Sequence, residues 1–209
     1  MPPGFDIELQ HLERGASVLA GCDEAGRGAL AGPLALGVVV FDPSTVRSCP
    51  AILRDVVRDS KQLSARGREE AFRVIKAHAL ETAVVMVSHR IVDRMNVNGA
   101  TEYALRKALL SLLSAPSVAL MDGKFSFTAS VPVVSVVKGD ALSLSIAAAS
   151  ILAKVTRDRV MVRLGGRFPG YGFATHKGYG TAEHMELIRM LGPSPVHRLS
   201  YEPVKSMSR

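Results

Sequence analysis

The sequence predicts an α/β domain in which helices cover the faces of a mixed sheet. Two apolar, valine-rich segments, residues 16–22 and 34–41, come first and have the composition of buried strands. Strand-like and helix-like segments then alternate along the chain, an order typical of helices packed on a sheet. The 209 residues suit one domain, and we find no internal repeat, low-complexity tract or linker.

The expected elements follow from apolar patterning and from the residues that begin or end each segment. Asp42-Pro43 ends the second strand as a turn, and residues 44–63 resemble loop and short helix. Ser64 is the predicted N-cap of the first long helix, and Thr181 of the last. The remaining expected elements are helices at 69–80, 101–113, 142–164 and 182–191, strands at 83–88, 118–121 and 131–137, and a glycine-rich loop at 165–180.

Charge and composition narrow the class of protein. A formal net charge of +7 favours a polyanionic partner, with nucleic acid before an anionic membrane, although a basic soluble protein would show the same balance. The chain has no tryptophan and few aromatic residues, which argues against a platform on which bases stack.

Cysteine usage and hydropathy indicate where the protein works. Cys22 and Cys49 are too few for a disulfide framework or a zinc site, which predicts a reduced, cytoplasmic protein. The first sixteen residues contain three acids and no apolar run, so we expect no signal peptide. The most apolar stretch, residues 29–41, is too short to span a bilayer, so no membrane association is expected.

Acidic residues follow three of the predicted strands. Asp23-Glu24 follows the first strand, Asp122 the fourth and Asp140 the fifth, each near a glycine. Any one of them alone could be a helix cap, a turn residue or a solvated charge. As a set they indicate a ligand site, because ligands of open α/β sheets bind at the carboxyl ends of strands. Asp23 and Glu24 would converge only if the chain bends after Asp23, since neighbours on a strand point to opposite faces.

The residue types in this set indicate the metal. Oxygen ligands without histidine or cysteine favour Mg²⁺ or Mn²⁺ over zinc. Four carboxylates can hold two such ions about 3.5–4 Å apart, one to activate an attacking water and one to stabilise a leaving oxygen. The sequence therefore predicts a site for two divalent ions.

Six short motifs then carry a resemblance. They are GCDEAGRG at 21–28 with Gly32-Pro33 after it, DSKQLS at 59–64, DGK at 122–124, KGD at 138–140 with AAASILAKVTRD at 147–158, HKGYGT at 176–181, and HRLSYEPV at 197–204. In this order they resemble the ribonuclease HII family over about residues 17–205. A lone Asp-Glu pair would be weak evidence, whereas six ordered motifs are specific.

The resemblance implies a ribonuclease H-like fold, with a five-stranded mixed sheet flanked by helices and a small helical C-terminal part. The first and fourth strands would be adjacent, which would bring Asp23 and Asp122 together. It also implies a single catalytic domain over residues 1–209, with a core at about 17–164 and a substrate-binding extension at 165–209.

The resemblance also implies an activity. Such an enzyme hydrolyses the RNA strand of RNA–DNA hybrids and nicks duplex DNA on the 5′ side of embedded ribonucleotides, leaving 5′-phosphate and 3′-hydroxyl ends, as in ribonucleotide excision repair. Its catalytic and metal-binding set would be Asp23, Glu24, Asp122 and Asp140. Some bacterial members carry a glutamate five residues beyond the position of Asp140, where this chain has Ser145. The fourth carboxylate is then Asp140 or comes from elsewhere.

Several residues are candidates for substrate binding. Gly26-Arg27-Gly28 suits recognition of a ribose 2′-hydroxyl, because residues without a Cβ let the backbone approach the sugar, and Arg27 can hold a neighbouring phosphate. The resemblance supports Tyr179 as a residue that stacks on the next sugar or base. The simpler interpretations are a tight turn, a packed tyrosine and solvated charges. Candidate phosphate contacts are Lys61, Lys154, Lys177 and Arg198.

Other functions remain open at the level of sequence. Junction resolvases also use clustered carboxylates and two metals, and a non-catalytic nucleic-acid-binding protein could retain the fold, although all four carboxylates are present here. A nucleotide phosphotransferase is disfavoured, since no glycine-rich loop ending in Gly-Lys-Ser/Thr occurs. Nothing in the sequence requires more than a monomer, and recruitment by a sliding clamp cannot be read from it.

Overall fold

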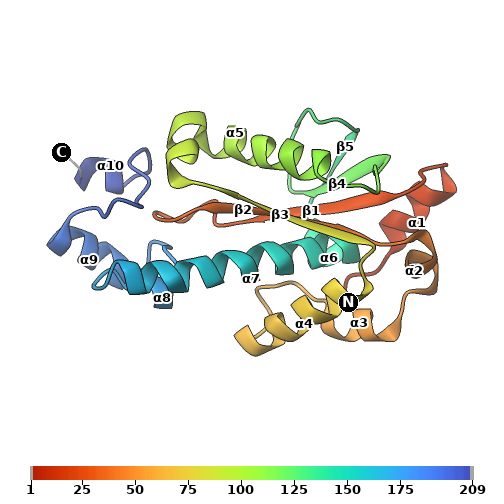
Figure 1. Ribbon diagram of the computed structural model, residues 1–209, viewed down its shortest axis with the longest axis horizontal. Coiled ribbons are helices and arrows are strands. Elements are labelled where there is room, and N and C mark those ends of the chain that lie inside the picture. The colour runs from red at the N-terminus through yellow and green to blue at the C-terminus, as the bar shows by residue number, and fades with distance from the viewer. Residues whose placement is uncertain (1, 208–209) are drawn as a thin grey trace.

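The computed structural model describes residues 2–207 and shows one mixed sheet between two layers of helices (Figure 1). The sheet has five strands in the order β3-β2-β1-β4-β5. β1 pairs antiparallel with β2 and parallel with β4, which confirms the expected adjacency of the first and fourth strands. β2 pairs antiparallel with β3, and β4 pairs parallel with β5. The strands are β1 (Leu19–Ala25), β2 (Leu34–Val40), β3 (Glu81–Val87), β4 (Val118–Asp122) and β5 (Val133–Val136).

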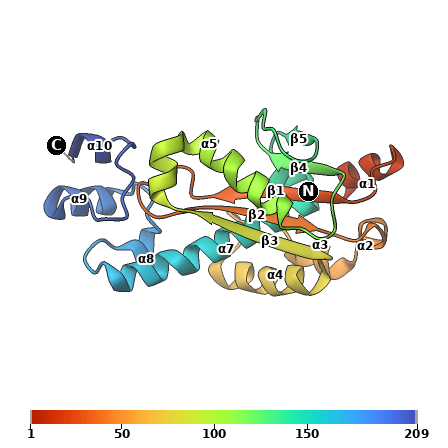
Figure 2. The same cartoon turned by 45° about the horizontal axis from the view of Figure 1, so that its top comes forward.

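The helices divide between the two faces of the sheet. Helix α5 (His89–Leu110) covers one face and α7 (Leu144–Arg167) the other, with α4 (Ala65–His78) beside α7 (Figures 1 and 2). The C-terminal helices lie together beyond the far end of α7. The other helices are α1 (Asp6–Glu13), α2 (Pro43–Ser48), α3 (Ala51–Val56), α6 (Gly139–Leu142), α8 (Phe173–His176), α9 (Ala182–Leu191) and α10 (Val204–Met207).

Both predicted caps are confirmed. The Ser64 hydroxyl accepts a hydrogen bond from the backbone N–H of Gly67 at 3.1 Å, and the Thr181 hydroxyl accepts one from His184 at 3.2 Å. Such bonds satisfy backbone donors that the first turn of a helix leaves free. Helix α9 has the predicted bounds, whereas α4 begins four residues before its predicted start.

Helix α5 differs most from prediction, because it begins twelve residues before the expected start at 101. Asn96 interrupts it with φ 56° and ψ 174°, and its side chain accepts hydrogen bonds from the backbone N–H groups of Asn98 and Gly99. Asn96 is therefore the N-cap of a second helical segment, and the sequence pattern identified only that segment. Helices α1, α8 and α10 were also not predicted, since each is short.

Helix α7 packs on the sheet through small residues. A Cβ added to Gly21 of β1 would lie 2.3 Å from the backbone carbon of Ser145, and one added to Gly37 of β2 would lie 2.3 Å from the carbonyl oxygen of Ala149. Contacts this short do not occur between real atoms, so neither glycine can be replaced without moving the helix. The fully buried run Ala147–Ala149 completes this close contact.

The C-terminal part packs on the loop between β1 and β2. Leu30 donates a backbone hydrogen bond to Gly178 at 2.7 Å, Gly32 donates to Val196 at 2.9 Å, and Arg198 donates to Leu30 at 2.8 Å. Ala29 and Ala31 also form isolated bridges with residues 179 and 197. The segment after α7 therefore holds the glycine-rich loop in place by backbone bonds.

The packing of α7 gives a first prediction. Gly37→Ala should lower the free energy of unfolding by at least roughly 1–3 kcal/mol, the usual cost of overpacking, because its new Cβ meets backbone rather than a mobile side chain. Gly166→Ala is the matched control, since Gly166 is exposed on α7 with open space around it. It should stabilise the protein by about 0.5–1 kcal/mol. Urea unfolding measures both, and equal effects would contradict the packing argument.

Candidate active site

Three carboxylates converge at the end of the sheet. Asp23 lies in β1, Asp122 ends β4 and Asp140 lies in α6, and one oxygen from each lies within 4.8 Å of the other two. The strand register explains the first pair. Cys22 of β1 is level with Met121 of β4 in the parallel ladder, so the next residue of each strand is an aspartate, and both point to the α7 face.

Asp140 reaches this pair from the short helix that follows β5. The backbone N–H of Gly139 donates to the Asp122 carboxylate at 2.6 Å, which joins α6 to the end of β4. Lys138 precedes it with φ 57°, in the left-handed region, and so turns the chain sharply out of the strand. The predicted convergence of Asp23, Asp122 and Asp140 is thus present in the structure.

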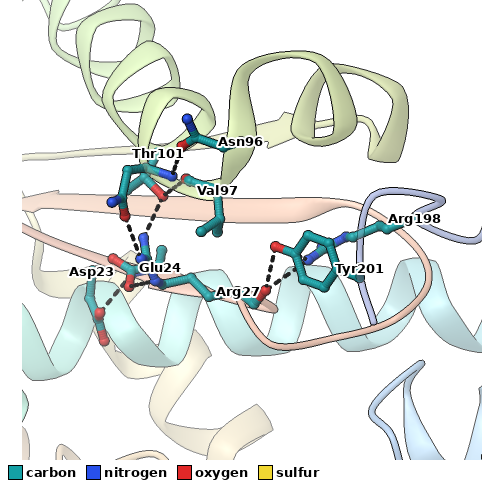
Figure 3. Close-up of polar contacts among 9 residues, drawn as sticks. Asp23, Glu24, Arg27, Asn96, Val97, Thr101, Arg198 and Tyr201 are labelled. Atoms are coloured by element: carbon teal, nitrogen blue, oxygen red, sulfur yellow. Dashed lines mark hydrogen bonds and ion pairs between the residues drawn. The ribbon is translucent and has the colours of Figure 1, made fainter. Parts of the chain in front are cut away.

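Glu24 takes a different position from the one expected. β1 continues to Ala25, so the bend after Asp23 that convergence would require is absent, and the chain turns at Gly26, where φ is 90°. The side chains of Asp23 and Glu24 therefore lie on opposite faces of the sheet, toward α7 and α5 respectively (Figure 3). Glu24 remains close enough to Asp122 for their charges to interact.

Arg27 binds within the protein rather than projecting freely. Its guanidinium donates to the Thr101 hydroxyl at 2.9 Å and to the Asn98 side chain at 2.7 Å, and it lies 3.5 Å from the Glu24 carboxylate (Figure 3). It also lies over the ring of Phe125, 4.9 Å from the centroid. The phosphate contact predicted for Arg27 stays a prediction, and in this structure its side chain links Glu24 to α5.

The electrostatics of the cluster reflect charges that are buried close together. Burial raises the pKa of Asp23 well above its usual range, and the charges of Glu24 and Asp122 add to the effect. Burial raises the pKa of Glu24 to about 7, although Arg27 opposes the shift. The pKa of Asp122 is raised by burial and by Asp140. Such shifts are typical of functional sites in which buried carboxylates lie close together.

One cation already contacts the cluster. The Lys61 ammonium, on a largely exposed side chain, lies 3.1 Å from the Asp140 carboxylate. Its neighbour Ser60 is buried and hydrogen bonds to Ser150 of α7 at 2.9 Å, and Ser150 in turn hydrogen bonds to Asp23. The DSKQLS motif therefore reaches the site through Ser60 and Lys61.

A pocket of about 470 Å³ opens over these acids. Gly26, Arg27 and Gly28 form one wall, and Lys61, Lys154 and Tyr179 lie around it. Gly28 is exposed, and a Cβ added there would meet no atom within 4 Å, whereas one added to Gly26 would collide with the Arg157 side chain at 2.0 Å. Gly26 thus serves packing, while Gly28 faces open space beside the carboxylates.

Three histidines support the backbone of Tyr179. The N–H of Ser194 donates to His197 Nδ1 at 2.8 Å, so His197 Nε2 carries the hydrogen that it shares with His184 Nε2 at 3.0 Å. His184 Nδ1 then donates to the carbonyl oxygen of Tyr179 at 2.9 Å. Burial lowers the pKa of His184 and of His197 to about 4, which keeps both rings neutral. His176 stacks on His184, with ring centroids 4.1 Å apart.

Two candidate phosphate contacts lie outside the pocket. Arg198 is fully buried and donates to the carbonyl oxygens of Gly32 and Arg27 and to the Tyr201 hydroxyl, so the expectation that it contacts phosphate is corrected: it fixes the glycine-rich loop. Lys177 borders a separate groove of about 680 Å³ between α4 and α7, where it donates to the carbonyl of Ala174.

Sequence reasoning missed the residues that orient the candidate ligands. Asn98 and Thr101 lie on α5 and bind Arg27, and Ser150 of α7 binds Asp23. Their local sequence does not indicate these contacts. Thr101 resembles any other residue of a helix, and Asn98 resembles a residue at the start of one. Ser150 alone lay inside a motif that could have drawn attention to it.

A sheet of this topology, with carboxylates where its two central parallel strands end, defines a nuclease of the ribonuclease H-like fold. The comparisons with known proteins agree. The family model of ribonuclease HII matches residues 20–204. A ribonuclease HII of Caulobacter vibrioides is 45% identical over 206 residues, which cover 99% of this chain and 94% of that protein.

Solved structures show the same relationship. The ribonuclease H2 of Pyrococcus horikoshii OT3 superposes with a TM-score of 0.77 at 29% identity, over 91% of this chain and 97% of that one. An RNase HII of Archaeoglobus fulgidus, solved in complex with PCNA, gives a TM-score of 0.74 at 27% identity, over 88% and 95%.

The chain belongs to the ribonuclease HII family. It is a ribonuclease H, an endonuclease class that acts on RNA–DNA hybrids and depends on divalent metal. This assignment decides against a junction resolvase and against a non-catalytic binding protein. Among the helices of residues 2–207, none has the length and apolar character needed to cross a membrane.

The raised pKa values predict how stability depends on pH. Because Asp23, Glu24 and Asp122 hold protons in the folded state that the unfolded state has released, their contribution is complete below the unfolded pKa values and is lost as pH rises. In the metal-free protein this loss should extend to about pH 7, the pKa of Glu24.

Mg²⁺ should therefore raise the melting temperature more at about pH 8 than at about pH 5. The measurement is thermal unfolding in Mg²⁺ and in EDTA at both pH values. The lowered pKa values of His184 and His197 make stability fall as pH falls, and comparing Mg²⁺ with EDTA at one pH removes that contribution. In Asp23→Asn the difference between the two pH values should shrink. An equal effect of Mg²⁺ at the two pH values would show that these acids do not bind it.

Proposed function

We propose that the protein hydrolyses the RNA strand of RNA–DNA hybrids and nicks duplex DNA on the 5′ side of embedded ribonucleotides. Two divalent ions, Mg²⁺ or Mn²⁺, would be held by Asp23, Glu24, Asp122 and Asp140. The observation that carries this proposal is the convergence of three carboxylates beneath a pocket lined by Gly26, Arg27 and Gly28.

The residues fit divalent ions on their own chemistry. The cluster offers only oxygen ligands, which suits hard cations. One buried oxygen of Glu24, Oε2, has no hydrogen-bond partner among residues 2–207, which leaves it available to a cation. Divalent ions at such a site neutralise charge on the phosphate and promote ionisation of the attacking water. A cation bound beside Asp23 and Asp122 would favour their charged forms, which burial and their mutual charge disfavour in the free protein.

The reaction is hydrolysis of one phosphodiester bond. Water adds to the phosphorus, the bond to the 3′ oxygen breaks, and that oxygen leaves with a proton, which gives 5′-phosphate and 3′-hydroxyl ends. Lys61 lies beside Asp140 and lines the pocket. Its ammonium can therefore hold an oxygen of the phosphate that neighbours the scissile phosphate. The role of Arg27 in this proposal is to orient Glu24.

The ribose would be recognised by the loop at Gly28. Its backbone is exposed in the pocket wall and no side chain shields it, so the 2′-hydroxyl can exchange hydrogen bonds with main-chain groups there. Tyr179 also lines the pocket, with Lys154 5.4 Å and Arg157 5.2 Å from its ring centroid. Its ring would stack on the next sugar or base of the strand.

The segment after α7 would extend the substrate-binding surface. It supplies Tyr179 to the pocket and Lys177 to the groove beside it. We propose Lys61, Lys154 and Lys177 as phosphate contacts, within a chain whose net charge of +7 attracts nucleic acid. Because the archaeal relative was solved in complex with PCNA, recruitment by a sliding clamp is part of the proposal, with this chain acting as a monomer.

Loss of one carboxylate tests the metal centre. Asp122→Asn keeps the shape of the side chain and removes its charge, so we expect cleavage of a duplex with one ribonucleotide to fall by more than ~10³-fold while the fold is retained. Cleavage rates with Mg²⁺, Mn²⁺ or EDTA measure this, and an all-DNA duplex should remain uncut. Glu183→Gln, on an exposed residue of α9, is the control. Near-normal turnover by Asp122→Asn would refute the two-ion proposal.

Gly28→Ala tests the reading of the ribose. The added methyl group meets open space in the free protein, so folding should be unaffected. With substrate bound it would displace the sugar, and a misplacement of about 1 Å can cost ~10²-fold in rate. We expect cleavage to fall by that order while affinity for all-DNA duplex, which depends on phosphate contacts, stays unchanged. Full activity would show that the backbone at Gly28 does not contact the sugar.

A further inference from the structure

Glu8 is a fully buried carboxylate that the chemistry above does not use. Its Oε1 accepts three hydrogen bonds, from the Ser143 hydroxyl at 2.6 Å and from the backbone and hydroxyl of Ser145 at 3.0 and 2.5 Å. Burial raises the pKa of Glu8, and these bonds oppose the shift. Burying a carboxylate costs free energy. The other acids of helix α1, Asp6 and Glu13, are exposed and do not carry this cost, so the burial of Glu8 calls for an explanation.

The serines that Glu8 binds lie at the end of the turn that carries Asp140. Helix α6 has only four residues, too few to be stable alone. At its N-terminal end, the backbone N–H of Gly139 donates a hydrogen bond to the Asp122 carboxylate. At its last end Ser143 donates its backbone N–H to Gly139 at 2.8 Å and adopts an extended conformation, with φ −108° and ψ 125°, from which α7 begins. The position of Asp140 therefore depends on how both ends are held.

The N-terminal segment holds the second end. Leu144 donates a backbone hydrogen bond to Gly4 at 2.7 Å, and Gly4 forms a parallel bridge with Ser143. Phe5 is buried in edge-to-face contact with Phe41, with ring centroids 5.3 Å apart, which anchors this segment to the core. Glu8 adds the only side-chain hydrogen bonds that run from residues 4–8 to Ser143 and Ser145 in the described part of the chain.

We propose that Glu8 is a positioning residue of the metal centre. By holding Ser143 and Ser145 it fixes the turn that carries Asp140, and so sets the distance between Asp140 and the Asp23–Asp122 pair. The proposal rests on the proposed function, since it takes these three acids as metal ligands. Glu8 lies outside residues 20–204, which the family model matches, whereas Ser143 and Ser145 lie inside them.

A purely structural role for Glu8 makes a different prediction. If Glu8 only anchored α1, its loss would lower the melting temperature but leave metal affinity unchanged at temperatures where the protein is folded. If it positions Asp140, its loss weakens metal binding in the folded protein. Metal affinity measured without substrate therefore distinguishes the two roles.

The experiment is calorimetric titration of the full-length protein with Mn²⁺. Glu8→Ala should weaken binding by about 10–100-fold, the range found when groups that orient metal ligands are removed. Glu8→Gln keeps an oxygen that can accept the same bonds and should recover most of the affinity. Glu13→Ala, on the exposed end of the same helix, should bind as the wild type does. In hybrid cleavage, the Mn²⁺ concentration for half-maximal rate should rise by the same factor in Glu8→Ala.

Each other outcome counts against a stated part of the proposal. A folded Glu8→Ala that binds Mn²⁺ as tightly as the wild type would overturn the role of Glu8. If Glu8→Ala does not fold, Ser145→Ala removes one of the three bonds and should still weaken binding by about threefold or more; unchanged affinity would again overturn it. A wild type that binds no Mn²⁺ refutes the metal centre and Glu8's part in it. A wild type that binds Mn²⁺ without cutting hybrids refutes the proposed function only.

Discussion

Helix α7 lies closer to the sheet than ordinary side chains would permit, and the arrangement of the site depends on that approach. Gly21 and Gly37 admit the helix backbone at the start of the contact. Farther along, Arg157 fills the space that the absent Cβ of Gly26 leaves. The helix therefore fixes both the strand that presents Asp23 and the loop that follows it. An added methyl group at the first contact would push the helix away from the sheet and so strain the second contact, because a close-packed interior transmits strain.

The overall charge of the protein and the charge of its candidate site are opposite in sign. The chain carries a net charge of +7, which attracts nucleic acid over a distance limited by salt. Against this overall positive charge stand the buried acids of the site, whose pKa values are raised first by burial and then by the charges of their acidic neighbours. The acids therefore tend to hold protons in the free protein, and a cation bound among them would favour their charged forms.

The sequence predicted what depends on local pattern or on a motif. It placed every strand of the sheet within a few residues, it placed α9 with its cap, and the motifs brought Asp23, Asp122 and Asp140 together. The sequence-based prediction was wrong or silent where a side chain contacts residues that are distant in the sequence. Arg198 was predicted to contact phosphate because a basic residue in a motif looks available, yet it is fully buried and donates to backbone carbonyl groups. The sequence around Glu8 does not indicate that it accepts hydrogen bonds from Ser143 and Ser145, which lie 135 and 137 residues farther along the chain.

The parallel pairing of β1 with β4 has a consequence for how the protein folds. The two strands are separated by about a hundred residues that contain β2, β3 and α5, and non-local contacts of this kind form late and slowly. Asp23 has no acidic partner from the other strand until the ladder closes, and Asp140 joins only when α6 has docked on β4. Partly folded chains therefore possess no assembled centre. The carboxylate cluster is therefore a product of the tertiary fold, since its three acids come from β1, β4 and α6 and meet only where these elements pack together.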